Sequence, residues 1–147
     1  MKVISIVLLM LFFYCQPVIA QKSKINHIAL HVTHLEKSTH FYHKVLELDT
    51  IPEPFKDGKH TWLSMGYGVQ LHLIESLPQP VIPLKNTHIC ISVPSVAVFV
   101  KKLSAQKIHW EDWAGTKHAI TTRKDGVLQI YLRDPDGYWI EVNDAYN

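Results

Sequence analysis

The chain has 147 residues, a length that suits a single domain with one hydrophobic core. Its 15 Lys and Arg nearly balance its 13 Asp and Glu, so the formal net charge is only +2. A charge this small does not imply a polyanionic partner, and we expect no binding to nucleic acid. The composition therefore favours a small globular domain.

The first residues predict export. An apolar run from Val3 to Phe13 follows a positively charged start, and the modest side chains of residues 18–20 suit a signal-peptidase site. We expect residues 1–20 to be a cleaved signal peptide, which leaves residues 21–147 as a periplasmic or secreted domain without membrane association. A retained anchor is the alternative, but the run is short for a bilayer span. Cys90 is then the one cysteine of the mature chain, which excludes a disulfide scaffold.

The first half of the mature chain, residues 21–76, predicts a strand, a helix and two further strands. Thr33 and Glu36 have the spacing of a capping box at a helix start. The glycine-rich residues 66–68 predict a turn between the last two strands. The strands are expected over residues 25–32, 62–65 and 69–74.

Residues 77–86, with three prolines between 77 and 83, predict a linker to a second half over residues 87–147. Pro94 and Ser95 are typical of a helix start, and the apolar residues that follow have helical spacing. The order of elements therefore repeats. Strands are expected over residues 88–93, 127–132 and 138–142, with a tight turn over 134–137.

The two halves carry polar residues at matching places. Alignment of the first strands sets His27 over His88, and alignment of the last strands sets His72 over Glu141. Because duplicated units stack or close on one another, we expect these four side chains to converge. One buried histidine alone more often has an ordinary hydrogen-bonding role, but four matched polar residues favour a metal site. Their nitrogen and oxygen atoms suit one divalent ion of Zn, Ni, Co, Mn or Fe(II).

Further residues are expected around this site. Strand alternation places His31 on the face of His27 and Cys90 on the face of His88, so both are candidates for a substrate pocket. The sequence positions no base for Cys90, so we do not expect it to be a nucleophile. Aromatic candidates for the pocket are one matched pair, which can equally fill the core, and a second pair expected to form a lid: Trp62 and Tyr131, then Trp110 and Trp113.

Four segments spread over nearly all of the mature chain carry family motifs. They are Ile25-Asn-His-Ile-Ala-Leu-His-Val, Ser38-Thr-His-Phe-Tyr-His-Lys-Val-Leu-Glu-Leu, Asn86-Thr-His-Ile-Cys-Ile-Ser-Val and Arg133-Asp-Pro-Asp-Gly-Tyr-Trp-Ile-Glu-Val. In these segments the chain resembles the vicinal oxygen chelate superfamily. The resemblance implies an α+β fold in which paired βαβββ modules form a cupped, partly closed mixed sheet around the metal. It leaves a homodimer open, because members pair modules within a chain or between chains.

The resemblance also implies roles for the four polar residues. His27, His88 and Glu141 match the ligands that the family uses most widely, and His72 matches a fourth position that is usually a carboxylate in glyoxalase I. In lyase and isomerase members the metal polarises a bound carbonyl or diolate while a carboxylate moves the adjacent proton. Glu141 would be that carboxylate.

We therefore expect an exported, metal-dependent lyase or isomerase of glyoxalase type that acts on a small carbonyl or hydroxy-acid compound. Glutathione is disfavoured as a partner of that substrate, because His31 and Ser76 stand where glyoxalase I carries Arg and Asn. One alternative is a non-haem Fe(II) extradiol-type dioxygenase, since two His and one Glu form a facial triad. Another is a non-catalytic protein that binds a small molecule such as an antibiotic.

Overall fold

The computed structural model describes residues 22–76 and 84–145. The predicted signal peptide and most of the predicted linker lie outside these residues. Within them, no helix has both the length and the apolar character needed to cross a membrane.

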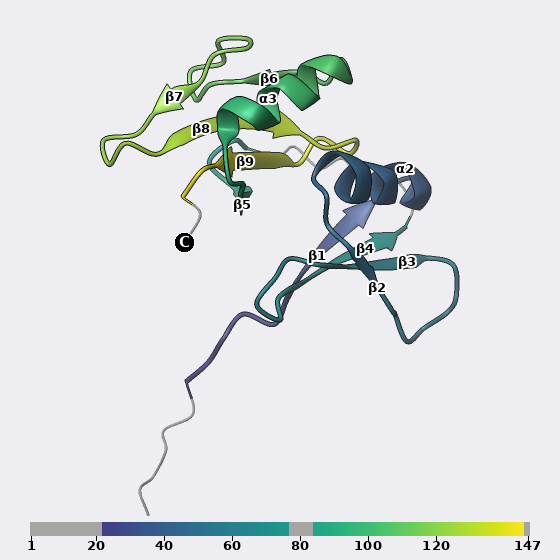
Figure 1. Ribbon diagram of the computed structural model, residues 1–147. Helices are drawn as coiled ribbons and strands as arrows, with labels where there is room; N and C mark the ends of the chain where they lie inside the picture. The colour runs from purple at the N-terminus through teal and green to yellow at the C-terminus, as the bar shows by residue number, and fades with distance from the viewer. Residues whose placement is uncertain (1–21, 77–83, 146–147) are drawn as a thin grey trace, which may run out of the picture.

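The first module is a four-stranded mixed sheet with a helical segment packed on it (Figure 1). The strand order is β1-β4-β3-β2, in which β1 is parallel to β4 and the other pairs are antiparallel. A parallel pair requires a long crossover, and the helical segment provides it. The elements are β1 (His27–Val32), α2 (Leu35–His40), the π-helical η1 (Phe41–Val45), β2 (Thr50–Ile51), β3 (His60–Ser64) and β4 (Gln70–Glu75).

The second module repeats this plan. Its sheet has the order β5-β9-β8-β6, with β5 parallel to β9 and with β7 paired to β8. The α+β class and the paired modules are therefore confirmed. The partly closed sheet that the resemblance implied is not formed, because each module keeps its own open sheet (Figure 1). The elements are β5 (His88–Ser92), α3 (Val96–Ala105), β6 (Trp110–Glu111), β7 (Thr121–Thr122), β8 (Leu128–Arg133) and β9 (Trp139–Asn143).

The two helix starts differ from each other. The α3 helix begins at the predicted place, and Ser95 caps it, because its hydroxyl oxygen accepts a hydrogen bond from the backbone N–H of Val98. The capping box predicted for Thr33 at the start of α2 is wrong. The carboxylate of Glu75 on the neighbouring strand accepts from the N–H of Leu35 instead, while Thr33 donates to a residue of the other module.

That residue is Asp136, in the turn between β8 and β9. The turn forms as predicted, because the N–H of Gly137 donates to the carbonyl of Asp134. The carboxylate of Asp136 accepts from the N–H of Thr33 (2.8 Å), from its hydroxyl (2.6 Å) and from the hydroxyl of Ser38 (2.8 Å). Burial by itself would raise the pKa of Asp136, but these donors lower it overall. The Asp136 turn thus fastens the second module to the helical segment of the first.

A second buried contact joins the modules next to this turn. The hydroxyl of Tyr42, which is fully buried, donates to the carboxylate of Asp134 at 2.8 Å. Burial raises the pKa of Asp134 despite this bond. Around both contacts, apolar side chains of the two modules form one core, which includes Leu30, Val32, Leu71, Val96, Leu103, Ile140 and Val142.

Candidate metal site

One half of the predicted ligand set lies on β5 and β9, the parallel pair of strands in the second module. His88 begins β5 and Glu141 lies on the adjacent β9, with His88 Nε2 and Glu141 Oε2 3.1 Å apart. His88 Nδ1 lies 2.8 Å from the carbonyl oxygen of Lys85, which only a proton on Nδ1 can satisfy. A neutral ring then points an Nε2 lone pair at a carboxylate oxygen. Two acceptors this close require a proton or a metal ion between them.

The spacing of these two atoms fits one ion. Ligands about 2.1 Å from a common metal lie about 3.0–3.4 Å apart at octahedral or tetrahedral angles. The hydrogen bond from His88 Nδ1 to a backbone carbonyl is also the kind that holds metal-binding histidines in place. His88 and Glu141 therefore fit a divalent cation.

Glu141 is surrounded by donors. Its Oε2 accepts from the hydroxyl of Tyr131 at 2.7 Å, and its Oε1 accepts from Asn143 Nδ2 at 2.9 Å and from the thiol of Cys90 at 3.5 Å. Burial by itself would raise the pKa of Glu141, but the bonds from Asn143, Tyr131 and Cys90 and the nearby His88 lower it overall. The side chain is thus held as a carboxylate in a fixed orientation.

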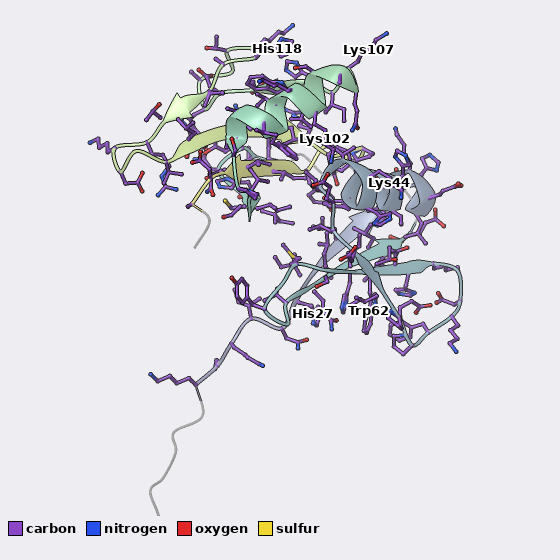
Figure 2. All side chains as sticks on the ribbon, viewed as in Figure 1. His27, Lys44, Trp62, Lys102, Lys107 and His118 are labelled. Atoms are coloured by element: carbon purple, nitrogen blue, oxygen red, sulfur yellow. The ribbon has the colours of Figure 1, made fainter. Side chains whose placement is uncertain are left out.

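The other half of the predicted set lies on the first module, where three aromatic rings are stacked. The rings of His27 and His72 are 4.3 Å apart between centroids and tilted by only 8°. Trp62 covers the opposite face of His72 at 3.9 Å and 5°. His27 Nδ1 lies 2.8 Å from Asn26 Oδ1, whereas His72 uses Nε2 to reach Gln70 Oε1 at 2.8 Å. Figure 2 shows His27 and Trp62 on the same side of the sheet.

The structure therefore pairs His27 with His72 and His88 with Glu141. Across residues 22–76 and 84–145, no three His, Cys, Asp or Glu side chains are grouped so that they could hold a metal ion. The convergence of all four side chains on one ion stays a prediction. The structure does show that His72 and Glu141 occupy equivalent places in the two modules. Trp62 pairs with His72 across β3 and β4, and Tyr131 pairs with Glu141 across β8 and β9.

The other pocket candidates are distributed unevenly. Cys90 lies beside Glu141, and desolvation together with that carboxylate raises its thiol pKa to about 12, which agrees with its predicted lack of nucleophilic character. His31 is hydrogen-bonded through Nδ1 to Ser76, at the far end of β1 from His27. Trp110 is only 4% exposed and belongs to the core, so the lid prediction is wrong for it, while Trp113 is 46% exposed.

Two residues that organise the site were missed in the sequence. Asn143 bonds both Glu141 and Cys90, and Gln70 bonds His72. Each lies two positions from a predicted ligand on the same strand. Strand alternation places such residues on the ligand's face, so this period was the signal that could have found them.

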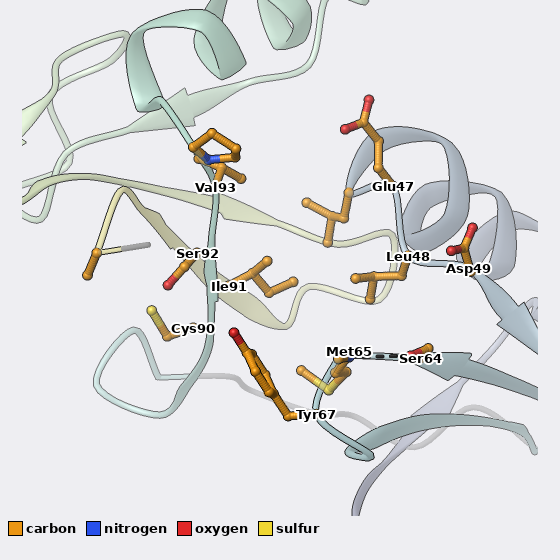
Figure 3. A pocket seen from close by; sticks show the side chains of 14 residues that line it. Glu47, Leu48, Asp49, Ser64, Met65, Tyr67, Cys90, Ile91, Ser92 and Val93 are labelled. Atoms are coloured by element: carbon orange, nitrogen blue, oxygen red, sulfur yellow. Dashed lines mark hydrogen bonds between the residues drawn. The ribbon is translucent and has the colours of Figure 1, made fainter. Parts of the chain in front are cut away.

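A groove of about 830 Å³ lies between the modules, and its lining includes Cys90, whose thiol contacts Glu141 (Figure 3). Its walls come from β5, from the turn between β3 and β4 and from residues 46–49 after η1. Tyr67, at the tip of that turn, projects toward β5 and is 99% exposed. Cys90 lines the groove and also donates to Glu141, so the groove borders the hydrogen-bonded surroundings of that carboxylate. Its volume is large enough for a small substrate.

Taken together, fold and site define a class of protein built from two βαβββ modules, each presenting a pair of potential metal ligands from equivalent strands. Residues 24–142 match the family model described as the Glyoxalase/Bleomycin resistance protein/Dioxygenase superfamily. The chain belongs to this superfamily.

The proteins similar to this chain include some named as glyoxalases and, by fold, some named as oxidases. The chain is 29% identical to "Glyoxylase I 4" of Arabidopsis thaliana, over 82% of this chain and 70% of the relative. It is 27% identical to a "Lactoylglutathione lyase" of Pseudomonas putida, over 80% and 82% of the two chains. The solved structure of "Oxidase ChaP-H1" superposes with a TM-score of 0.69 at 23% identity, over 85% of this chain and 98% of the other, which shows a shared fold.

Proposed function

We propose that the protein is a metal-dependent lyase or isomerase of glyoxalase type that acts on a small carbonyl or hydroxy-acid compound. The observation that carries the proposal is the facing of His88 Nε2 and Glu141 Oε2 at 3.1 Å, with the other nitrogen of His88 already bonded. A divalent ion held there by His88, Glu141 and His27 would polarise the oxygen atoms of a bound substrate.

Within this proposal Glu141 moves the proton. It is kept ionised by its donors, so it can accept a proton from a carbon next to a carbonyl and return it to the neighbouring position. Tyr131 and Asn143 hold the two carboxylate oxygens and so fix the direction from which the proton is taken. The groove beside Cys90 would receive the rest of the substrate.

A substrate without glutathione is also favoured by the first module. His31 Nδ1 is hydrogen-bonded to Ser76, so these two residues contact each other where glyoxalase I carries Arg and Asn. We accordingly propose a substrate smaller than a glutathione adduct. Comparing turnover of a simple hydroxy-carbonyl compound with turnover of a glutathione hemithioacetal checks this choice.

We further propose that two copies of the chain complete the site. A complete site needs His27 from the first module together with His88 and Glu141 from the second. In the described residues of one chain these side chains are not grouped around one position. β1 and β5, which carry His27 and His88, each stand at an end of their sheet. A symmetric dimer that sets β1 of one copy near β5 of the other would join the two pairs twice.

A mixing experiment tests this arrangement. His27→Ala and His88→Ala are each expected to lose metal when purified alone. If copies exchange freely, about half of all dimers in the mixture contain one copy of each variant. Each of these dimers has one complete site out of two, so the metal capacity returns to about a quarter of the wild-type value. Two folded variants that recover nothing on mixing would refute a site shared between copies.

The proposed reaction is tested by metal analysis followed by isotope exchange. The wild type should bind one divalent ion per chain, and the metal-loaded protein in D2O should exchange the proton next to the carbonyl of its substrate. Glu141→Gln should abolish that exchange. A wild type that takes up no divalent metal on reconstitution would sink the proposal.

An extradiol-type dioxygenase is the second candidate, and the state of His72 favours it. Its tip nitrogen is engaged by Gln70, which leaves two His and one Glu for the ion. Anaerobic loading with Fe(II), followed by oxygen uptake in the presence of a catechol, identifies this activity. Ligand binding that survives removal of the metal would instead indicate a sequestering protein.

Export is proposed on the sequence alone. Expression of the full chain in a bacterium should yield a protein outside the cytoplasm whose first residue is Gln21. Recovery of the uncleaved chain in the membrane fraction would indicate a retained anchor.

A further inference from the structure

We propose that His72, although it stands at the fourth ligand position, does not bind the metal and instead positions His27 as the middle ring of an aromatic stack. The inference rests on the metal site proposed above. It concerns how many ligands the chain supplies, and therefore how many positions remain for substrate.

The planes of the rings are the first observation. A histidine binds a metal through a lone pair that lies in the plane of its ring, about 2.0–2.1 Å from the ion. The stacked rings of His27 and His72 are tilted by only 8° with centroids 4.3 Å apart, so their planes run side by side. An ion in the plane of His27 therefore lies outside the plane of His72.

His72 is not free to turn toward such an ion. Trp62 covers its other face at 3.9 Å, with the ring planes within 5° of parallel, and Phe55 packs against the Trp62 ring at 6.1 Å. His72 is only 8% exposed. Rotation of its ring would break contacts on both faces and push into packed neighbours.

The hydrogen bonds of the ring nitrogens also separate His72 from the two proposed histidine ligands, independently of the ring planes. His27 and His88 both use Nδ1 in a local hydrogen bond, which leaves Nε2 at the tip of each ring for a metal. His72 has the opposite arrangement, because it is Nε2 at the ring tip that lies 2.8 Å from the side-chain oxygen of Gln70. The tip of His72 already has a hydrogen-bonding partner, so a metal ion there would have to displace Gln70.

The stack gives His72 a different task. Its outer face is covered by the ring of His27, which is exposed and would otherwise sample several orientations. A ring held on one face by stacking and at Nδ1 by Asn26 loses little further freedom when Nε2 binds an ion. His72 and Trp62 are therefore positioning residues for His27.

The count of protein ligands follows. His27, His88 and Glu141 supply three, and a six-coordinate ion then keeps three positions for molecules other than the protein. A substrate that binds through two neighbouring oxygens occupies two of them. The third is open to water or another small molecule, which a fourth protein ligand would have displaced.

The test replaces the rings without removing the stack. His72→Phe keeps a flat ring but no nitrogen, so its metal affinity, measured by chelator competition, should stay within about twofold of the wild type. His27→Phe, the matched control, should lose about 100-fold or more, as for deletion of a ligand. Trp62→Leu removes no ligand atom but loosens the stack, and should cost about 10-fold.

A spectroscopic readout accompanies these affinities. The visible spectrum of the Co(II)-loaded protein depends on the number and type of ligands, and it should be the same for the wild type and His72→Phe. A loss for His72→Phe as large as that for His27→Phe, or a changed Co(II) spectrum, would overturn the inference. Gln70→Leu provides a second variant, since it frees the tip of His72 and should leave the spectrum unchanged.

Failure of the proposed function is recognised separately. A wild type that binds no metal refutes the metal site, and the stack is then judged by NMR of the metal-free protein. The ring protons of His72 should be shifted upfield by Trp62 and should lose that shift in Trp62→Leu. Unshifted ring protons in the wild type would overturn the stack itself.

Discussion

Replacement of Asp136 by Ala should destabilise the whole fold, because one carboxylate holds the second module to the first. Three hydrogen bonds converge on it, from the N–H and hydroxyl of Thr33 and from the hydroxyl of Ser38. Ser38 is fully buried and would be left without this acceptor, whereas Thr33 is only partly buried and can recover bonds to water. We expect a loss of about 2–4 kcal/mol in the free energy of unfolding.

This loss is large enough for a thermal melt. A folded part of about 120 residues has an unfolding entropy of about 0.25 kcal/mol/K near 60 °C, so the Tm should fall by about 8–16 °C. Asp125→Ala is the matched control, since its carboxylate is 52% exposed and contacts only its own loop and Arg123. It should change the stability by less than about 0.5 kcal/mol.

The wild type and Asp136→Ala also differ in how their stability depends on pH, and the sign of that difference can be predicted. The folded-state pKa of Asp136 is lowered, so its stabilising contribution is complete above the unfolded-state pKa of about 3.9 and is lost as the pH falls through the folded value. The difference between the wild type and Asp136→Ala should be constant near neutral pH and shrink in acid. A Tm for Asp136→Ala equal to that of Asp125→Ala would refute the reasoning.

Three further substitutions test other parts of the structure. Tyr131→Phe removes a donor to the buried Glu141 and should weaken metal binding about 10-fold in chelator competition, with a loss of about 1–3 kcal/mol in stability; unaltered affinity would show that this bond does not orient Glu141. Tyr42→Phe leaves the buried Asp134 short of a donor and should cost about 1–3 kcal/mol in urea unfolding, which an unchanged midpoint would contradict. Ser95→Ala removes the cap of α3 and should cost about 1 kcal/mol, whereas Ser95→Gly should cost only a few tenths.

The regular parts of the fold were predictable because they have a period. The apolar residues of α3 recur at helical spacing, and the long strands carry alternating or continuous apolar runs, so each was placed to within about two residues. The short strands β2, β6 and β7 were missed. Each has two residues, too few to show a period, and each exists because a longer neighbouring strand offers it hydrogen bonds.

The wrong cap at α2 has a different cause. Thr33 has the local sequence of a helix cap, but its hydroxyl bonds Asp136, which is 103 positions away in the chain. Local spacing carries no information about such a partner. The core position of Trp110 was hidden for the same reason, because its neighbours are assembled by the sheet rather than by the sequence around it.

At the site, the sequence was informative about position and silent about orientation. The duplication correctly matched His27 with His88 and His72 with Glu141, since equivalent strands occupy equivalent places. It could not show that His72 lies flat against His27 while Glu141 faces His88 edge-on. That difference depends on which residue lies beside each one, a flat Trp62 in the first module and a hydrogen-bonding Tyr131 in the second.

The placement of β1 and β5 at the ends of their sheets would couple metal binding to the abundance of the protein. Under the two-copy proposal, an ion held between these strands belongs to no single molecule, and separation of the copies releases it. The apparent affinity for metal should then fall as the protein is diluted, which a site built within one chain would not show. If the protein is exported as proposed, it is diluted on release, and the strength of the contact between copies would then decide whether it keeps its metal.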